Sequence, residues 1–278
     1  MDRRPIGVFD SGLGGLTVLK ELCRVLPNEN FIYFGDTGRV PYGSRSTETI
    51  TKYARQDMRF LQTFDIKAVV VACCTVSSLW KSIQNEYSIP SVSVVAPSAR
   101  HASETTTNGR IGVIGTAATI NSRAFEIELK RLLPHAEVFS AACPLFVPLV
   151  ENGRIHPGDK VIELVACEYL EPFLTFGCDT LVLGCTHFPL LWRIISDILP
   201  QVNLINPGVS AANELIRILK ENELLSDSDS TGSVSYYVSD DTGNFSELAS
   251  LFMEQNITNS VSKVDIDEYR GEERYHEG

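Results

Sequence analysis

The sequence predicts an α/β protein with two similar domains, each a mostly parallel sheet flanked by helices, related by a pseudo-twofold axis, with the active site between them. Short apolar runs alternate with longer helical patterns, which is typical of βαβ units. Two apolar runs also end alike. Residues 69–72 lead into Cys73-Cys74-Thr75, and residues 180–184 lead into Cys185-Thr186-His187. This repetition indicates one site assembled from two related halves.

The elements are predicted in order from the apolar runs and the helical patterns between them. The first unit has expected strands over 6–9, 31–35 and 67–72, and expected helices over 15–26, 47–63 and 76–87. The second unit has expected strands over 111–115, 136–140 and 179–184, and expected helices over 119–133, 159–174 and 188–198. The remainder is predicted as a helix over 209–221, a polar loop over 226–232, a strand over 234–238, a helix over 245–254 and a loosely ordered charged tail from 265.

The domain boundaries are expected where proline and glycine interrupt the pattern. Pro90 and Pro97 mark the crossing into the second unit, and Asn206-Pro207-Gly208 marks the return. The segment after this return would most simply pack back onto the first unit. We therefore predict a discontinuous first domain of residues 1–97 and 208–278, and a second domain of residues 98–207.

Composition argues against several classes of partner. The formal net charge is −11 and no basic stripe is present, which disfavours nucleic acid and anionic membranes. No apolar stretch approaches the length of a membrane span, and no signal-peptide core follows the first residues, so neither an anchor nor a secretory signal is expected. Seven cysteines without zinc-ligand spacing predict a reduced, cytoplasmic protein with no metal site.

Polar residues gather where the predicted strands end, which is where ligands bind in open α/β sheets. Asp10 and Ser11 follow the first strand, Asp36 follows the second, and Thr116 and Thr119 follow the fourth. The glycines over 12–15 are expected to let backbone amides approach a small anionic ligand.

Cys73 and Cys185 each stand at the start of a predicted helix, where unpaired amides and the helix dipole favour a thiolate. A Cys-His hydrolase would use one thiol and leave the other unexplained. Two facing thiols suit a racemase or epimerase, because one removes a proton from a carbon and the other supplies a proton to its opposite face. His187 and Asp10 are either the proton-handling helpers of these thiols or ordinary residues at helix starts.

The other cysteines receive the ordinary interpretation, because cysteine is among the most buried residue types. We expect inert buried thiols at four positions, Cys23, Cys143, Cys167 and Cys178.

Taken together, the motifs over residues 6–210 resemble those of the cofactor-independent glutamate racemases. The resemblance rests on segments 10–15, 72–75, 112–119 and 183–187, and on Gly35-Asp36 with Pro41-Tyr42-Gly43. It implies interconversion of L- and D-glutamate without pyridoxal phosphate or another cofactor, supplying D-glutamate for peptidoglycan. Glutamate is the implied partner, and a homodimer is one option for the assembly.

The resemblance also implies roles for individual residues. Cys73 and Cys185 would be the paired acid and base, with Asp10 assisting the first, and His187 with Glu151 assisting the second. The substrate would be held by residues from both units: Asp10, Ser11, Pro41, Tyr42, Gly43, Cys74, Thr75, Thr116, Thr119, Thr186 and His187.

Three positions depart from the family pattern. Cys74 stands where asparagine is usual, so a carboxamide is replaced by a weak thiol donor, while Phe125 and Asn206 replace a commoner tyrosine and aspartate. The residues alone leave two further functions open. One is a racemase for aspartate or another acidic amino acid, and the other is a weakened binding protein that retains the pocket.

Overall fold

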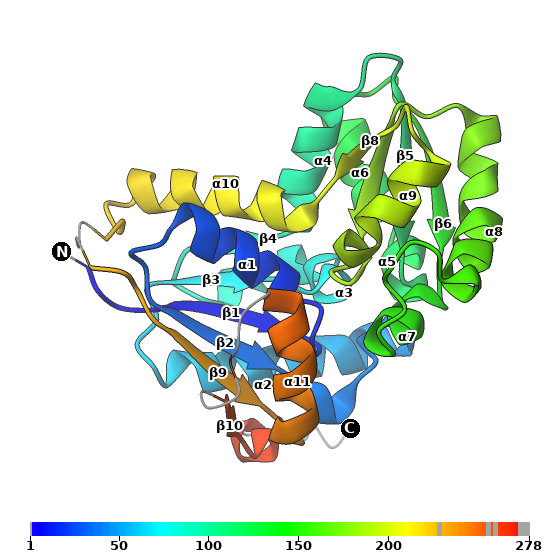
Figure 1. The fold of residues 1–278 in the computed structure, drawn as a ribbon. Helices are drawn as coiled ribbons and strands as arrows, with labels where there is room; N and C mark the ends of the chain where they lie inside the picture. The colour runs from blue at the N-terminus through cyan, green and yellow to red at the C-terminus, as the bar shows by residue number, and fades with distance from the viewer. Residues whose placement is uncertain (1, 227–229, 254–256, 258–260, 272–278) are drawn as a thin grey trace, which may run out of the picture.

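Two sheets of parallel strands form the framework of the molecule in the computed structural model, which describes residues 2–226, 230–253, 257 and 261–271 (Figure 1). The first sheet has the strand order β10-β9-β2-β1-β3-β4. Its strands are β1 (Ile6–Asp10), β2 (Phe31–Gly35), β3 (Ala68–Val71), β4 (Ser91–Ser93), β9 (Val234–Val238) and β10 (Val261–Lys263).

The second sheet repeats the central strand order of the first. Its order is β6-β5-β7-β8, with β5 (Arg110–Gly115), β6 (Glu137–Ala142), β7 (Thr180–Gly184) and β8 (Asn203–Ile205). The strand β5 lies between β6 and β7, as β1 lies between β2 and β3, and every pairing is parallel. The predicted fold class of two similar, mostly parallel sheets flanked by helices is confirmed.

Helices cover both sheets because the buried strands need an apolar layer on each face. The helices are α1 (Leu16–Val25), α2 (Thr47–Gln62), α3 (Cys74–Ser77), α4 (Val95–Thr105), α5 (Ala117–Asn121), α6 (Ala124–Leu132), α7 (Phe146–Glu151), α8 (Lys160–Phe176), α9 (Trp192–Ile198), α10 (Pro207–Glu221) and α11 (Thr242–Met253). Figure 1 shows α10 lying along α1 and reaching toward α4, and these helices are in contact. The helix α10 therefore packs against elements of both units.

The segment after β8 returns to the first sheet, as predicted. The strand β9 pairs with β2, and α11 packs against α1. Asn206 begins this return as the N-cap of α10, with its side chain accepting a hydrogen bond from the amide of Gly208. Of the predicted polar loop, residues 227–229 lie outside the described part of the chain, as do residues 272–278 of the predicted tail.

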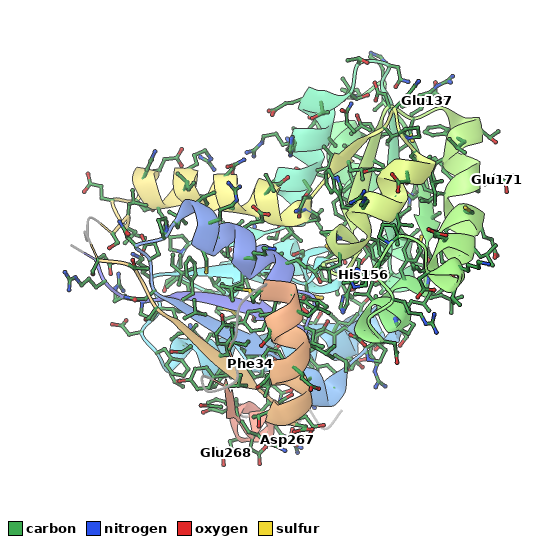
Figure 2. All side chains as sticks on the ribbon, in the orientation of Figure 1. Phe34, Glu137, His156, Glu171, Asp267 and Glu268 are labelled. Atoms are coloured by element: carbon green, nitrogen blue, oxygen red, sulfur yellow. The ribbon has the colours of Figure 1, made fainter. Side chains whose placement is uncertain are left out.

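The tail expected to be loosely ordered from 265 begins with structure. Residues Ile266–Tyr269 form a short 3₁₀ helix, η6, that packs against α2. Figure 2 labels Asp267 and Glu268 of this turn, close to β10 at the lower end of the molecule. Burial of Ile266 gives the turn its apolar anchor.

The helix predicted over 76–87 was wrong. The helix α3 ends at Ser77, and two 3₁₀ turns, Trp80–Ser82 and Gln84–Glu86, follow it. Serine side chains compete for backbone groups here, since Ser77 donates to the carbonyl of Val71 and accepts from the amide of Val94.

The single helix predicted over 119–133 is two helices. The break falls at Arg123, whose φ of 54° lies in the left-handed region. The hydroxyl of Ser122 supports the break by donating to Thr119 and accepting from the amide of Ala124.

Three elements near the crossings were missed by sequence reasoning. The strands β4 and β8 are only three residues long, and α4 contains Pro97, which was interpreted as an interruption. Proline is compatible with a helix there because it occupies the first turn of α4.

A buried ion pair lies at the amino-terminal ends of the strands of the first sheet, just before β2 and β3 begin. The side chains of Lys67 and Glu29 are almost fully buried, with Nζ 2.6 Å from Oε2. Lys67 also donates to the carbonyls of Asp2 and Leu224, and Glu29 accepts from the amide of Ser226. This cluster joins the chain start, two strand starts and the end of α10.

Candidate active site

A cavity of about 420 Å³ lies between the two sheets, at the carboxyl ends of their strands. Segments that follow β1, β2 and β3 meet segments that follow β5, β6 and β7. The lining residues are Ser11, Gly12, Val40–Ser44, Cys73–Thr75, Thr116, Ala117, Cys143, Pro144, Val147, Pro148, Glu151 and Cys185–His187. None of these described residues is lysine or arginine, so a bound carboxylate would meet hydroxyls and backbone amides.

Cys73 lines the cavity directly after β3, as the N-cap residue of α3. Its thiol lies 3.6 Å from the hydroxyl of Ser11, to which it donates. Burial, together with the nearby charge of Asp10, raises the pKa of Cys73 to about 12. The group at this end of the cavity is therefore a protonated thiol at neutral pH.

Asp10 lies behind the cavity wall and is fully buried. Its carboxylate accepts hydrogen bonds from the amide of Gly12 and the hydroxyl of Thr186. Burial raises the pKa of Asp10, while His187 acts in the opposite direction. Asp10 influences Cys73 through charge, and Ser11 provides the hydrogen bond that the sequence did not predict.

Cys185 follows β7, the strand that corresponds to β3, and has a different set of neighbours. Its sulfur lies 3.8 Å from Nδ1 of His187, whose Nε2 lies 2.9 Å from Oε1 of Glu151. Burial lowers the pKa of His187, but the hydrogen bonds to Cys185 and Glu151 outweigh it and raise the pKa to about 10. The imidazolium therefore donates to both neighbours at neutral pH.

Three threonine hydroxyls come together across the two units. The hydroxyl oxygens of Thr75, Thr116 and Thr119 lie 3.0–3.3 Å apart. Thr75 and Thr116 line the cavity, whereas Thr119 is buried behind them. Thr119 thus holds the other two hydroxyls in place without facing the cavity.

Tyr42 lines the cavity, but its hydroxyl is engaged elsewhere. The hydroxyl donates to the carboxylate of Asp36, and it also lies 3.2 Å from Oδ2 of Asp57. The wall formed with Pro41 and Gly43 meets the second unit at Thr116, because a Cβ on Gly43 would lie 2.8 Å from the Cβ of Thr116.

The glycines after β1 have a role that differs from the predicted one. A Cβ on Gly14 would lie 2.2 Å from Oγ1 of Thr186, and one on Gly15 would lie 2.4 Å from the Cβ of Asp10. Gly14 therefore allows the two units to approach each other, and Gly15 allows the start of α1 to pack against Asp10 within the first unit. Thr17 also links the two units, because its hydroxyl donates to the carbonyl of Thr186 with an oxygen-oxygen distance of 2.7 Å. Gly12 alone of this run lines the cavity.

Two expectations about the remaining cysteines require correction. Cys23 is only half-buried and Cys167 is exposed on α8, whereas Cys143 and Cys178 are buried as expected, with Cys143 also lining the cavity after β6. Cys143 and the other apolar lining residues after β6 were missed because the strand was expected to end at residue 140. The rule that ligands bind beyond the carboxyl ends of parallel strands could have pointed to these residues. Cys74 lines the cavity beside Cys73.

Phe125, one of the departures from the family pattern, is a core residue. It is buried in the apolar cluster of the second unit, and a Cβ on Gly184 would lie 3.1 Å from its ring.

The described residues contain no group of three or more His, Cys, Asp or Glu side chains placed to hold a metal ion. No helix within the described ranges is long and apolar enough to cross a membrane.

Two related sheets, whose corresponding strands β3 and β7 each lead to a cysteine on a shared cavity, define an α/β protein with one site built from two halves. Comparison with known proteins agrees with that class, since residues 10–215 match the model of the Asp/Glu/hydantoin racemase family. The chain belongs to this family and, among its members, to the glutamate racemases, which are isomerases.

Individual relatives support the same assignment. Glutamate racemase of Geobacter metallireducens is 46% identical over 255 residues, which is 91% of this chain and 94% of the relative. Glutamate racemase of Chlorobaculum tepidum is 47% identical over 253 residues, covering 90% of this chain and 92% of the relative. The crystal structure of the Francisella tularensis glutamate racemase in complex with D-glutamate is similar with a TM-score of 0.90 and 39% identity, covering 97% of this chain and all of that one.

Proposed function

We propose that this cavity interconverts L- and D-glutamate by proton transfer at Cα between the substrate and two thiols, Cys73 and Cys185. The observation that carries the proposal is their placement after corresponding strands, β3 and β7, on the lining of one cavity. Glutamate racemases supply D-glutamate for peptidoglycan, and the same role is proposed for this chain.

The two thiols have complementary environments for this chemistry. In one direction Cys185, beside the imidazolium of His187, acts as a thiolate and removes the Cα proton, while the protonated thiol of Cys73 supplies a proton to the opposite face. One C–H bond breaks and another forms, so the substrate is inverted and the thiolate has moved to Cys73. The reverse reaction uses the same groups in exchanged roles.

Stabilising the deprotonated carbon is the hard part of the reaction. The α-carboxylate gains enolate character, and hydrogen-bond donors aimed at it lower the barrier. Donors on the cavity wall are the hydroxyls of Ser11, Thr75 and Thr116 and the backbone around Gly43, while the hydroxyl of Thr186, also on the wall, donates to Asp10. We assign Asp10 and Thr119 to support behind this wall, and Pro41, Tyr42 and Cys74 to its shape.

The domain division predicted from the sequence is part of the proposal. Residues 1–97 with 208–278 would form one domain and residues 98–207 the other, with the cavity between them. Closure of such a cleft around the substrate would exclude water from the thiolates.

Because reduced thiols are required for the chemistry, we propose a cytoplasmic enzyme. A homodimer is the proposed assembly, and sedimentation analysis measures it.

The function is tested by incubating the purified protein with each enantiomer of glutamate in deuterated buffer without added cofactor. Optical rotation should decay to zero from either enantiomer, with deuterium entering Cα. Parallel incubations with L- and D-aspartate separate glutamate from the shorter acidic substrate. Absence of exchange with every acidic amino acid would refute the proposal.

Single serine substitutions test the assignment of the two thiols. Cys73→Ser and Cys185→Ser should each reduce kcat/KM by about a thousandfold or more, because a hydroxyl is a far weaker acid than a thiol. The matched controls are Cys74→Ser and Cys143→Ser, which change other thiols of the same cavity. An inactive Cys74→Ser protein with an active Cys73→Ser protein would reverse the assignment.

A further inference from the structure

A buried polar cluster stands directly behind the cavity wall formed by residues 41–43. It joins Asp36 and Arg39, which follow β2, to Tyr42 on the wall and to Asp57 on α2. Both carboxylates are fully buried, and the side chain of Arg39 is 14% exposed. Arg39 donates to Asp36 at 2.6 Å and to Asp57 at 3.0 Å, and its remaining terminal nitrogen donates to Gln56 at 2.6 Å.

The hydrogen-bond donors are distributed unequally between the two carboxylates. Asp36 accepts from Arg39, from Tyr42 and from the hydroxyl of Ser239, which is itself oriented by the amide of Gly38. Asp57 accepts from Arg39 at one oxygen, and its other oxygen shares the hydroxyl of Tyr42 with Asp36.

The contact between the Tyr42 hydroxyl and Asp57 needs a hydrogen that the Tyr42 hydroxyl cannot supply. The hydroxyl of Tyr42 has a single hydrogen, which it donates to Asp36, so it can only accept from a second partner. The oxygen of Asp57 at 3.2 Å completes the chain only if that oxygen carries a hydrogen. Two buried carboxylates facing one guanidinium also leave one excess negative charge, which a single proton neutralises.

We propose that Asp36, Arg39 and a protonated Asp57 are positioning residues that fix Tyr42, and with it the 41–43 wall of the substrate cavity. The hydrogen-bond chain runs from Asp57 to the Tyr42 hydroxyl and on to the Asp36 carboxylate. This inference rests on the proposed function, because the wall is assigned to substrate binding there. It assigns a role to a cluster whose side chains, apart from Tyr42, do not line the cavity.

The surrounding charges favour the same protonation state. Burial and the neighbouring Asp36 raise the pKa of Asp57 well above its usual range, while Arg39 opposes them. Burial likewise raises the pKa of Tyr42, with Asp57 and Asp36 adding to the effect, so the hydroxyl keeps its hydrogen. Other titratable groups that interact electrostatically with the cluster are Asp10 and Tyr87, which act on Asp57, and Asp267, which acts on Arg39.

Asparagine substitutions distinguish the two carboxylates, since asparagine reproduces a neutral acid. Asp57→Asn retains an acceptor for Arg39 and a donor for Tyr42, so KM and kcat for glutamate should stay within about threefold of the parent. Asp36→Asn turns one carboxylate oxygen into a donor that faces other donors, and KM should rise about tenfold or more. Asp57→Ala should resemble Asp36→Asn, and Asp65→Asn at an exposed site is the matched control.

Two outcomes would overturn the proposal. If Asp57→Asn raises KM as much as Asp36→Asn does, Asp57 functions as a carboxylate and holds no proton. If Asp36→Asn and Asp57→Ala are folded by circular dichroism and leave KM unchanged, the cluster does not position the wall.

A measurement without substrate separates this proposal from the proposed function. NMR of isotopically labelled aspartate carboxyl carbons, with the Asp57 signal assigned by its loss in Asp57→Asn, should show a protonated carboxyl near neutral pH. An ionised Asp57 refutes the inference even if the enzyme racemises glutamate. A protonated Asp57 in a protein without racemase activity would support the hydrogen-bond chain and refute the proposed function instead.

Discussion

Cys74 is a thiol at a position where the resemblance to the glutamate racemases implies asparagine, and it lies on the cavity wall at the first residue of α3. Burial, followed by the neighbouring Cys185 and Cys73, raises the pKa of Cys74 well above its usual range, so it remains a neutral thiol. A neutral thiol is a weak hydrogen-bond donor and acceptor, whereas a carboxamide offers two hydrogens and an oxygen. The residue therefore affects how tightly a polar substrate is held.

Restoring the carboxamide should tighten substrate binding. Cys74→Asn is expected to lower KM for glutamate by about threefold to tenfold, the value of one hydrogen bond, with little change in kcat. Initial-rate kinetics with both enantiomers measure the effect. Cys74→Ala is the control and should stay within about twofold of the parent. A KM that rises in the asparagine variant contradicts this account of the position.

His187 makes the stability of the protein depend on pH. Its pKa is about 10 in the folded protein against an ordinary value of 6.5, so the folded state binds the proton more tightly. The resulting stabilisation is fully present below pH 6.5 and is lost as the pH rises toward 10. Relative to His187→Gln, the parent should lose on the order of a few kcal/mol over this range.

Urea unfolding at several pH values measures this difference. Glu151→Gln is the informative companion, because removing the carboxylate weakens one interaction that raises the His187 pKa. The loss of stability should then end at a lower pH and be smaller in total than in the parent. A pH-independent difference between the parent and His187→Gln would show that folding does not raise the pKa of His187.

At the scale of the elements, the sequence predicts most strands and the residues that end them. Continuous apolar runs such as 180–184 identify buried parallel strands, and Cys73, Cys185 and Thr116 follow such strands in the structure. The very short β4 and β8 give too little pattern, and the break at Arg123 depends on local hydroxyl contacts. Lining residues after β6 were missed because the predicted strand ends at residue 140, whereas β6 continues to Ala142.

The close approach of α1 to the loop after β7 allows a test at this scale. Gly14→Ala would place a Cβ 2.2 Å from Oγ1 of Thr186 and 2.5 Å from Nδ1 of His187. We expect a loss of about 1–3 kcal/mol in stability and at least a tenfold fall in kcat/KM, because His187 must move.

Gly243→Ala is the matched control for this substitution. A Cβ there would meet its nearest neighbour, Oδ1 of Asp241, at an ordinary distance of 3.4 Å. Chemical denaturation and initial rates are measured for both variants. If Gly14→Ala behaves like Gly243→Ala, the two units do not need this close approach.

On the scale of the whole molecule, the carboxyl ends and the amino ends of the strands in the first sheet have separate roles. The carboxyl ends of β1, β2 and β3 lead into the cavity wall, while the Lys67–Glu29 pair lies where β3 and β2 begin. A buried pair of this kind is strongly destabilising when only one partner is removed, because the other charge is left without compensation. Stability and catalysis should therefore be separable by mutation.

Lys67→Met should lower the free energy of unfolding by about 3–5 kcal/mol and leave the kcat/KM of the folded protein unchanged. Denaturant unfolding and initial rates at a permissive temperature test both parts. The double variant Glu29→Leu/Lys67→Met should recover most of the stability, since it leaves no unpaired charge. A fall in kcat/KM of the folded single variant would show that the amino ends and the carboxyl ends of these strands are coupled.

The two halves of the cavity share a strand order but not their proton chemistry, because Cys73 faces a serine hydroxyl and Cys185 faces an imidazolium. Enantiomers have equal free energies in water, so kcat/KM for the two directions of a racemisation must be equal whatever the enzyme looks like. The inequality of the halves can therefore appear only in how each direction divides that common value between kcat and KM. A difference in saturation behaviour between the two enantiomers is the kinetic expression of this structural asymmetry.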